Sequence, residues 1–203
     1  EFNDDSARLV ANATLFSRQF GDRDGDGIPD GVEEEEGLDP DDPNVIIASM
    51  NHHVTYPWDE ESGGPTSGLF RSTDGGDSWT DITRNPGMPT GLIGKLGVSI
   101  SPAEASRVYA FIEADKGEGG IYRSDDGGSS WQRTHHDPGK MEIPNSYNYI
   151  TADTQDPDVV YIQPIVGLLK STDAGQTFEE VSMPNWDPHA LWIDPNNSRR
   201  TIE

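Results

Sequence analysis

The sequence predicts an all-β protein built from a repeated unit of short strands, and three observations lead to this prediction. One stretch of twelve residues occurs three times, at 68–79, 120–131 and 167–178. Each copy ends in Trp or Phe, so large apolar side chains recur at regular places. The chain also contains 22 glycines and 15 prolines that separate short apolar runs, as is typical of strands joined by tight turns.

Each copy of the repeat has the pattern of a strand, a tight turn and a returning strand. A serine ends the first strand, and Asp and Gly follow where the chain must reverse direction. The closing aromatic residue starts the return strand, where it can bury a large area under the hairpin. The residues expected to hold the three turns are Ser72, Asp74, Gly76, Trp79, Ser124, Asp126, Gly128, Trp131, Ser171, Asp173, Gly175 and Phe178.

The spacing of the copies predicts the size of the repeated unit. The three turn aspartates are 52 and 47 residues apart, a period that suits one four-stranded blade of a β-propeller. The expected strands are 44–49, 67–72 and 78–83 in blade one; 95–101, 107–112, 119–124 and 130–134 in blade two; 147–153, 158–162, 166–171 and 177–182 in blade three; and 188–194 at the start of blade four.

Residues 44–203 therefore predict a partial propeller of three to four blades, each of four antiparallel strands. Closed rings usually contain four to eight blades. We expect further blades to complete the ring, either from the same longer polypeptide or from other chains.

The repeat also resembles a known family. It matches S-x-D-x-G-x-[ST]-[WF], the Asp-box or BNR repeat of propellers that include sialidases, sortilin-like proteins and xyloglucanase-type glycosidases. Segments 39–48, 101–110 and 156–161 look like the family's link into the second strand of a blade, and 189–195 repeats the start of another. The resemblance covers about residues 37–203 and implies an Asp-box propeller of the sortilin and xyloglucanase-like type.

The first 43 residues carry 14 acidic side chains against three arginines. Within them, residues 22–33 fit a twelve-residue calcium loop, with Gly27 at the sharp turn. Carboxylates about 4 Å apart repel by roughly 4 kcal/mol per pair at an effective dielectric near 20, so such crowding favours a bound cation, and all-oxygen ligands favour Ca²⁺. The expected ligands are Asp22, Asp24, Asp26, the carbonyl of Ile28, Asp30 and Glu33.

The alternative for this segment is a solvated acidic linker. With residues 37–43, it resembles the bacterial thrombospondin type-3-like repeat, which implies an extracellular spacer stiffened by calcium over residues 22–43. In the preceding segment, 1–21, Leu9, Ala13, Phe16 and Phe20 would form one apolar stripe of a helix. A frayed terminus or an edge strand is the alternative there.

The amino-acid composition argues against several classes of function. The formal net charge of −23 comes from 37 acidic and only 14 basic residues, which argues against nucleic acid as a partner. The absence of cysteine excludes disulfides, thiolate metal sites and a cysteine nucleophile. No stretch approaches 18 apolar residues, so no membrane span is expected.

The connections of a blade divide between its two ends. The turns between strands 1 and 2 and strands 3 and 4 share one end, and the remaining loops share the other. The Asp-box aspartates fall at the first end, where we expect a structural role. The expected ligand face at the other end contains His52, His53, Tyr56, Trp58, His135, His136, Trp186 and His189.

Aromatic side chains beside carboxylates are typical of carbohydrate sites. The alternative is that these are solvated loops whose aromatic side chains pack between blades, and the adjacent histidines also leave a metal centre open. We therefore expect an extracellular or periplasmic, calcium-stabilised interaction or assembly module that binds protein or glycan. The alternative is a fragment of a secreted glycoside hydrolase acting on polysaccharide. Such an enzyme needs two carboxyl groups about 5–5.5 Å or about 6.5–9.5 Å apart, and the sequence identifies no such pair.

Overall fold

The computed structural model describes residues 45–136, 149–164, 167–182 and 190–202. These residues form strands β1 to β15 and contain no helix, so the all-β prediction is confirmed. It follows that this part of the chain has no helix able to cross a bilayer. The predicted helical segment 1–21 and the predicted calcium loop 22–43 lie outside the described residues.

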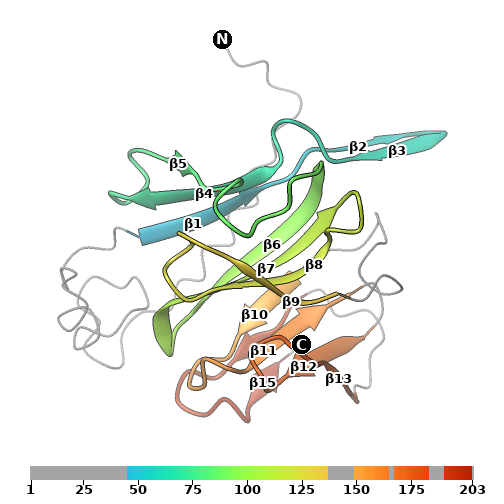
Figure 1. The fold of residues 1–203 in the computed structure, drawn as a ribbon. Coiled ribbons are helices and arrows are strands. Elements are labelled where there is room, and N and C mark those ends of the chain that lie inside the picture. The colour runs from blue at the N-terminus through green and yellow to red at the C-terminus, as the bar shows by residue number, and fades with distance from the viewer. Residues whose placement is uncertain (1–44, 137–148, 165–166, 183–189, 203) are drawn as a thin grey trace.

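The strands form antiparallel sheets that follow one another along the chain (Figure 1). Blade one contains β1 (Val45–Met50), β4 (Gly68–Thr73) and β5 (Thr80–Asp81). Blade two contains β6 (Ile93–Ser101), β7 (Glu104–Ala114), β8 (Gly120–Ser124) and β9 (Gln132–His135). Blade three contains β10 (Tyr149–Ala152), β11 (Val160–Gln163), β12 (Leu168–Ser171) and β13 (Glu179–Val181). A last pair is β14 (Trp192–Ile193) and β15 (Thr201–Ile202).

The blades pack face to face because their middle strands are apolar on both sides. Successive side chains of a strand point to opposite faces. In β7, Val108, Ala110 and Ile112 join a buried cluster that includes Ile47, Leu69 and Ile82 of blade one. The alternate residues Tyr109 and Phe111 join a second cluster with blade three.

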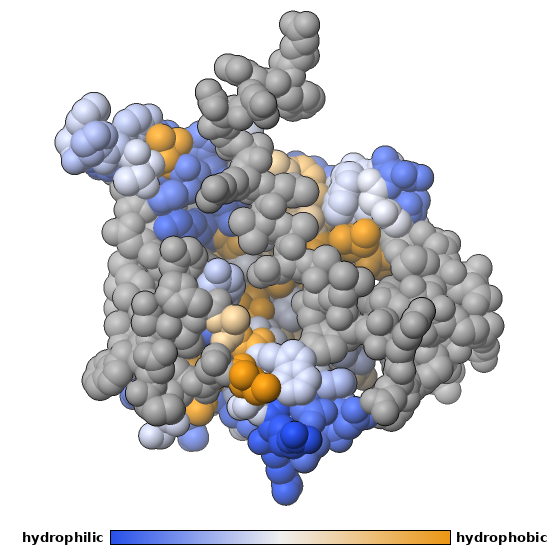
Figure 2. All heavy atoms as spheres, turned by 180° about the vertical axis from the view of Figure 1, so that it is seen from behind, coloured by the Kyte–Doolittle hydropathy of each residue, from blue (hydrophilic) through white to orange (hydrophobic). Residues whose placement is uncertain are grey.

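A third cluster continues the series, since Tyr161 and Leu168 of blade three pack with Ile193 of β14. The predicted architecture of a partial β-propeller is therefore confirmed. Among the described residues, the stacked sheets are one three-stranded sheet, two four-stranded sheets and one two-stranded sheet, and a second two-stranded sheet is the hairpin described below. Seen from behind, the described surface is largely hydrophilic and shows apolar residues only in small patches (Figure 2).

One strand is shorter than predicted. We expected a strand over 78–83, and β5 covers only Thr80–Asp81. The hydroxyl of Thr83 explains the difference, because it bonds with both backbone groups of Leu69, accepting from the N–H at 3.0 Å and donating to the carbonyl at 3.3 Å. Ile82 N–H still donates to the Leu69 carbonyl at 2.9 Å, but the Leu69 N–H bonds to the Thr83 side chain, so only one of the two backbone bonds of this pair forms.

The segment 50–66, expected to be a loop, contains an additional hairpin. Its strands are β2 (His53–Tyr56) and β3 (Asp59–Ser62), joined by a turn at Pro57 and Trp58. The hairpin extends beyond the stacked sheets (Figure 1). Proline favours the first central position of such a turn, and this was the local signal for a hairpin here.

Candidate functional site

Arg107, near the start of β7, shows which turns share an end of the molecule. Its guanidinium forms an ion pair with Asp125 in the β8–β9 turn and another with Asp158 in the β10–β11 turn, where Nη1 lies 2.8 Å from Oδ1. We call the end of the molecule that carries the β8–β9 and β10–β11 turns the box end. The opposite end, formed by hairpin β2–β3, residues 84–92 and the β7–β8 loop, is called the loop end.

The aspartates of the three repeated turns, at the box end, accept hydrogen bonds from groups of their own turns. In the first copy, Asp74 Oδ1 accepts from the Ser72 hydroxyl and from the Ser78 N–H, both at 2.8 Å, and Oδ2 accepts from the Ser78 hydroxyl. Ser72 Oγ also accepts from Gly76 N–H at 2.8 Å. Trp79 Nε1 donates to the Gly76 carbonyl at 3.0 Å.

The second and third copies repeat the bonds of the serine and the aspartate. Bonds from the Ser78 side chain and backbone lower the pKa of Asp74 to about 2. Bonds from Thr177 backbone and side chain likewise lower that of Asp173 to about 2. Carboxylates with this many donors organise a turn and are poorly placed to react with a ligand.

Each later turn also packs on the preceding blade. A Cβ atom added at Gly128 would lie 3.0 Å from Ile82 of blade one, and one at Gly175 would lie 3.3 Å from Ile121 of blade two. Trp131 N–H donates to the Pro86 carbonyl at 2.8 Å. The repeated turns therefore stabilise both the hairpins and the contacts between blades.

The loop end contains a pocket of about 320 Å³. It lies where hairpin β2–β3, the start of β6 and the β7–β8 loop meet. Its lining includes Ser62, Leu92, Glu113, Asp115, Lys116 and Gly119.

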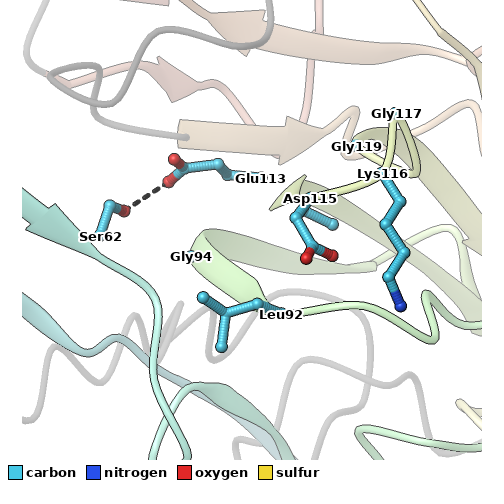
Figure 3. Close-up of a pocket in the computed structure, with 9 residues that line it drawn as sticks. Ser62, Leu92, Gly94, Glu113, Asp115, Lys116, Gly117 and Gly119 are labelled. Atoms are coloured by element: carbon cyan, nitrogen blue, oxygen red, sulfur yellow. Dashed lines mark hydrogen bonds between the residues drawn. The ribbon is translucent and has the colours of Figure 1, made fainter.

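Glu113 is fixed within this pocket. Its Oε2 accepts from the Ser62 hydroxyl at 2.6 Å and from the Lys95 N–H at 2.8 Å. Figure 3 shows Ser62 and Glu113 pointing toward one another, while Asp115 and Lys116 project from the loop that follows β7. Gly94 leaves room for this arrangement, because a Cβ there would lie 2.3 Å from Glu113 Oε2. The pocket is thus pre-formed around a positioned carboxylate.

The β7–β8 loop is tied to the neighbouring connection by Glu118. Its Oε2 accepts from the backbone N–H groups of Thr90 and Gly91, at 2.6 and 2.9 Å. These bonds, led by the one from Gly91, lower the pKa of Glu118. Glu118 is therefore an anchor of the pocket rim.

An aromatic pair stands at the tip of the hairpin, whose other end lines the pocket through Ser62. The rings of Tyr56 and Trp58 are stacked, with centroids 5.9 Å apart and an interplanar angle of 16°. The exposed fraction is 42% for Tyr56 and 82% for Trp58. A large apolar surface that remains open to solvent indicates an interaction site.

The histidines of the expected ligand face do not converge on one site. His52 is half-buried at the hairpin base, with Nδ1 3.4 Å from Thr66 Oγ1 and Nε2 3.8 Å from Glu61 Oε1. His53 Nε2 lies 3.2 Å from Thr55 Oγ1.

The two residues of the second histidine pair, His135 and His136, also have different partners. His135 Nδ1 donates to the Gln176 carbonyl at 2.7 Å, and its ring packs edge-on against Phe178 of blade three. Its role is therefore contact between blades, which was one of the alternatives. His136 Nδ1 donates to the carbonyl of Gly119, a residue of the pocket. Trp186 and His189 lie outside the described residues.

No three His, Asp or Glu side chains within the described ranges are grouped closely enough to hold a metal ion. The predicted calcium ligands, Asp22 to Glu33, lie before the first described residue. The calcium loop therefore stays a prediction.

The residues that sequence reasoning named for the ligand face do not include Ser62, Glu113 and Asp115, which line the pocket. The available signal was an acidic residue at the end of an apolar strand, followed by the glycine-rich segment 117–120. Ser62 and Glu113 are 51 residues apart in the chain, and only the folded structure brings them together.

No protein-family model matches the chain. A xyloglucanase of Paenibacillus sp. is 29% identical over 161 residues, which cover 76% of this chain and 15% of that protein. A xyloglucanase of Hypocrea jecorina is 31% identical over 152 residues, which cover 69% of this chain and 17% of that protein. The chain thus spans about a sixth of the length of these two relatives.

Among solved structures, the GH74 enzyme of Niastella koreensis superposes with a TM-score of 0.53 at 20% identity. The match covers 79% of this chain and 24% of the enzyme. This chain is therefore a set of β-propeller blades, similar in fold to part of a GH74 enzyme and in sequence to part of two xyloglucanases.

Proposed function

We propose that the loop end of these blades binds polysaccharide, as part of a longer propeller related to glycoside hydrolases. The observation that carries the proposal is the stacked, exposed pair Tyr56 and Trp58, which stands on a hairpin whose other end enters the pocket. Aromatic rings offer sugars a flat apolar surface, and nearby polar groups can bond the hydroxyls.

The geometry suits an extended ligand. Strand β3 begins beside Trp58 and ends at Ser62 in the pocket. Four residues of extended chain span about 13 Å. A polysaccharide that stacks on Trp58 would thus continue along the hairpin toward Ser62 and Glu113.

We propose binding, and not bond cleavage, for this part of the protein. Glu113 is held by two donors, and Asp115 is exposed to solvent. The bonds to Glu113 hold it within the fold, and solvent surrounds Asp115, whereas a catalytic pair acts from a site that excludes water. Any catalytic pair would therefore come from other blades.

The comparisons suggest which polysaccharide to try first. Both relatives named above are xyloglucanases, and xyloglucan is therefore the first probe. We also propose, from the sequence, that the protein acts outside the cytoplasm and that Ca²⁺ orders residues 22–33.

The binding test is electrophoresis through native gels containing xyloglucan. We expect the wild-type chain to be retarded and Trp58→Ala to migrate as in a gel without polysaccharide. Trp192→Ala is the matched control, because Trp192 is also partly exposed but belongs to another sheet. Equal retardation of wild type and Trp58→Ala, or none for either, would contradict the proposal.

A second candidate function is that of an assembly module. Apolar side chains that are exposed to solvent at two of the sheets favour it. The ring of Trp79 is 44% exposed, whereas its counterpart Trp131, covered by blade one, is 6% exposed. At β15, Ile202 is 66% exposed. Light scattering distinguishes the candidates, since assembly predicts a multiple of 22.2 kDa and a binding segment predicts that mass itself.

A further inference from the structure

We propose that Lys116 determines how tightly the loop end binds a sugar, because its ammonium group donates hydrogen bonds to the sugar oxygens. This inference rests on the proposed function, since it assigns a role to one residue of the same surface. Among the described residues that line the pocket, Lys116 carries the only positive charge. Two properties of this residue support the assignment: its backbone conformation and the lack of a partner for its side chain among the described residues.

Lys116 has a backbone conformation that lysine rarely adopts. It belongs to a turn over residues 115–118, in which the Glu118 N–H donates to the Asp115 carbonyl at 3.1 Å. Both central residues have positive φ, 58° at Lys116 and 69° at Gly117. Turns of this kind favour Asn, Asp or Gly at the first central position, because other side chains are strained there. Lysine therefore makes this turn less stable than Asn or Gly would.

Ala174 is the second residue other than glycine with positive φ among the described residues, and its surroundings differ. It is buried in the third box turn, where its N–H donates to the Asp158 carbonyl at 2.8 Å. Lys116 is exposed instead, and its ammonium group forms no hydrogen bond or ion pair with the described residues. Its charge contributes less to the low pKa of Glu118 than the hydrogen bonds do, led by the one from Gly91. Packing thus explains the conformation at Ala174, but no contact of the Lys116 side chain explains a lysine in its turn.

The turn holds Lys116 at the pocket before a ligand binds. On one side of it, the Asp115 N–H donates to the Leu92 carbonyl at 3.0 Å. On the other side, Arg133 Nη1 donates to the Gly117 carbonyl at 2.7 Å. Figure 3 shows the side chain of Lys116 projecting from this turn. Because the backbone is already fixed, binding orders little beyond the lysine side chain itself, which favours affinity.

The pocket lining offers both kinds of hydrogen-bonding group that a sugar hydroxyl can use. Glu113 Oε2 accepts two bonds within the protein, whereas Oε1 accepts none from the described residues. Asp115 supplies further acceptor oxygens beside it. The ammonium group of Lys116 supplies three donors. Hydrogen bonds that involve a charged group are about twice as strong as neutral ones, so loss of this donor should weaken binding clearly.

The test measures stability and binding in the same variants. Lys116→Asn removes the ammonium group and suits the positive φ of the turn. We expect it to melt at the temperature of wild type or about 2–4 °C higher. In native gels of increasing xyloglucan concentration, we expect it to bind about tenfold more weakly than wild type. A purely structural role of Lys116 would not combine unchanged or higher stability with weaker binding.

Two further variants are controls. Lys116→Arg keeps the positive charge and several donors, and it should bind as wild type does. Arg199→Asn removes one positive charge from an exposed residue between β14 and β15, and it should leave binding unchanged. Together they distinguish a role of the Lys116 ammonium group from an effect of net charge.

The remaining outcomes separate the two levels of the proposal. Unchanged binding by Lys116→Asn, while Trp58→Ala fails to bind, overturns the role of Lys116 and leaves polysaccharide binding intact. A lower melting temperature of Lys116→Asn overturns it too, because the lysine would then serve the turn. Equal loss of binding in Lys116→Arg or in Arg199→Asn likewise contradicts the assignment to this ammonium group. Failure of wild type to bind xyloglucan overturns the proposed function itself.

Discussion

Aspartates serve two different purposes in this protein, and their surroundings determine which. Asp74, Asp126 and Asp173 accept hydrogen bonds from the serine or threonine hydroxyls and backbone of their own turns. Asp59 and Asp115 instead lie exposed at the loop end. The first group stabilises hairpins, and the second lies on the surface where we propose that a ligand binds.

The low pKa of Asp74 predicts an effect of acid on stability. Its folded value of about 2 lies below the ordinary 3.8. The carboxylate therefore stabilises the fold above about pH 4, and this contribution is lost as the pH falls toward 2. Urea unfolding at pH values between about 4 and about 2 should show that the free energy of unfolding falls more steeply with decreasing pH for wild type than for Asp74→Ala.

Asp77 provides the matched control in the same turn. It is exposed, and the bonds that hold the turn go to Asp74 instead. Asp77→Ala should keep the melting temperature and acid response of wild type, while Asp74→Ala should melt earlier at neutral pH. Identical behaviour of the two variants would show that the turn does not depend on its carboxylate.

At the scale of single elements, the two hairpin types respond differently to loss of an aromatic side chain. Trp131 is buried between blades, and Trp58 is open to solvent. Trp131→Ala should lower the free energy of unfolding by about 3–5 kcal/mol. Trp58→Ala should change it by less than about 0.5 kcal/mol. Chemical denaturation measures both, and a large loss for Trp58→Ala would mean that the ring belongs to the core.

Gly87 and Gly117 test the contact between blades one and two. Both have positive φ, 88° and 69°, so alanine costs about 1–2 kcal/mol at either position. A Cβ at Gly87 would also meet the Trp131 carbonyl at 1.7 Å, whereas one at Gly117 meets nothing within 4 Å. Gly87→Ala should therefore be clearly the more destabilising in thermal melts. Equal losses would contradict the close approach.

The elements that the sequence predicts well are those whose signal is local and repeated. Apolar runs such as 108–112 identify strands buried on both faces, and each box identifies the turn after them. The β2–β3 hairpin has no second copy in the chain to reveal it. The bond between Glu113 and Ser62 joins residues far apart in the chain, and the contact of His135 with Phe178 depends on how blades stack. No local sequence pattern predicts either contact.

At the scale of the whole molecule, the predicted calcium loop should couple an acidic segment to the stability of the protein. Excess chelator should lower the melting temperature of wild type, because a cation bound only by the folded state stabilises it. Asp24→Ala should melt at the same temperature with and without chelator. A melting temperature of wild type that ignores both calcium and chelator would exclude a structural calcium site.

We propose that the two ends of the blades have different roles. The turns at the box end stabilise the propeller, and the loop end binds polysaccharide. Hydrogen exchange of the intact chain with and without xyloglucan oligosaccharide tests it most directly. We predict slower exchange on binding at residues 53–62 and 113–119, with the turns at 72–79, 124–131 and 171–178 unchanged. Protection at the box turns, or no protection anywhere at saturating oligosaccharide, would contradict the claim.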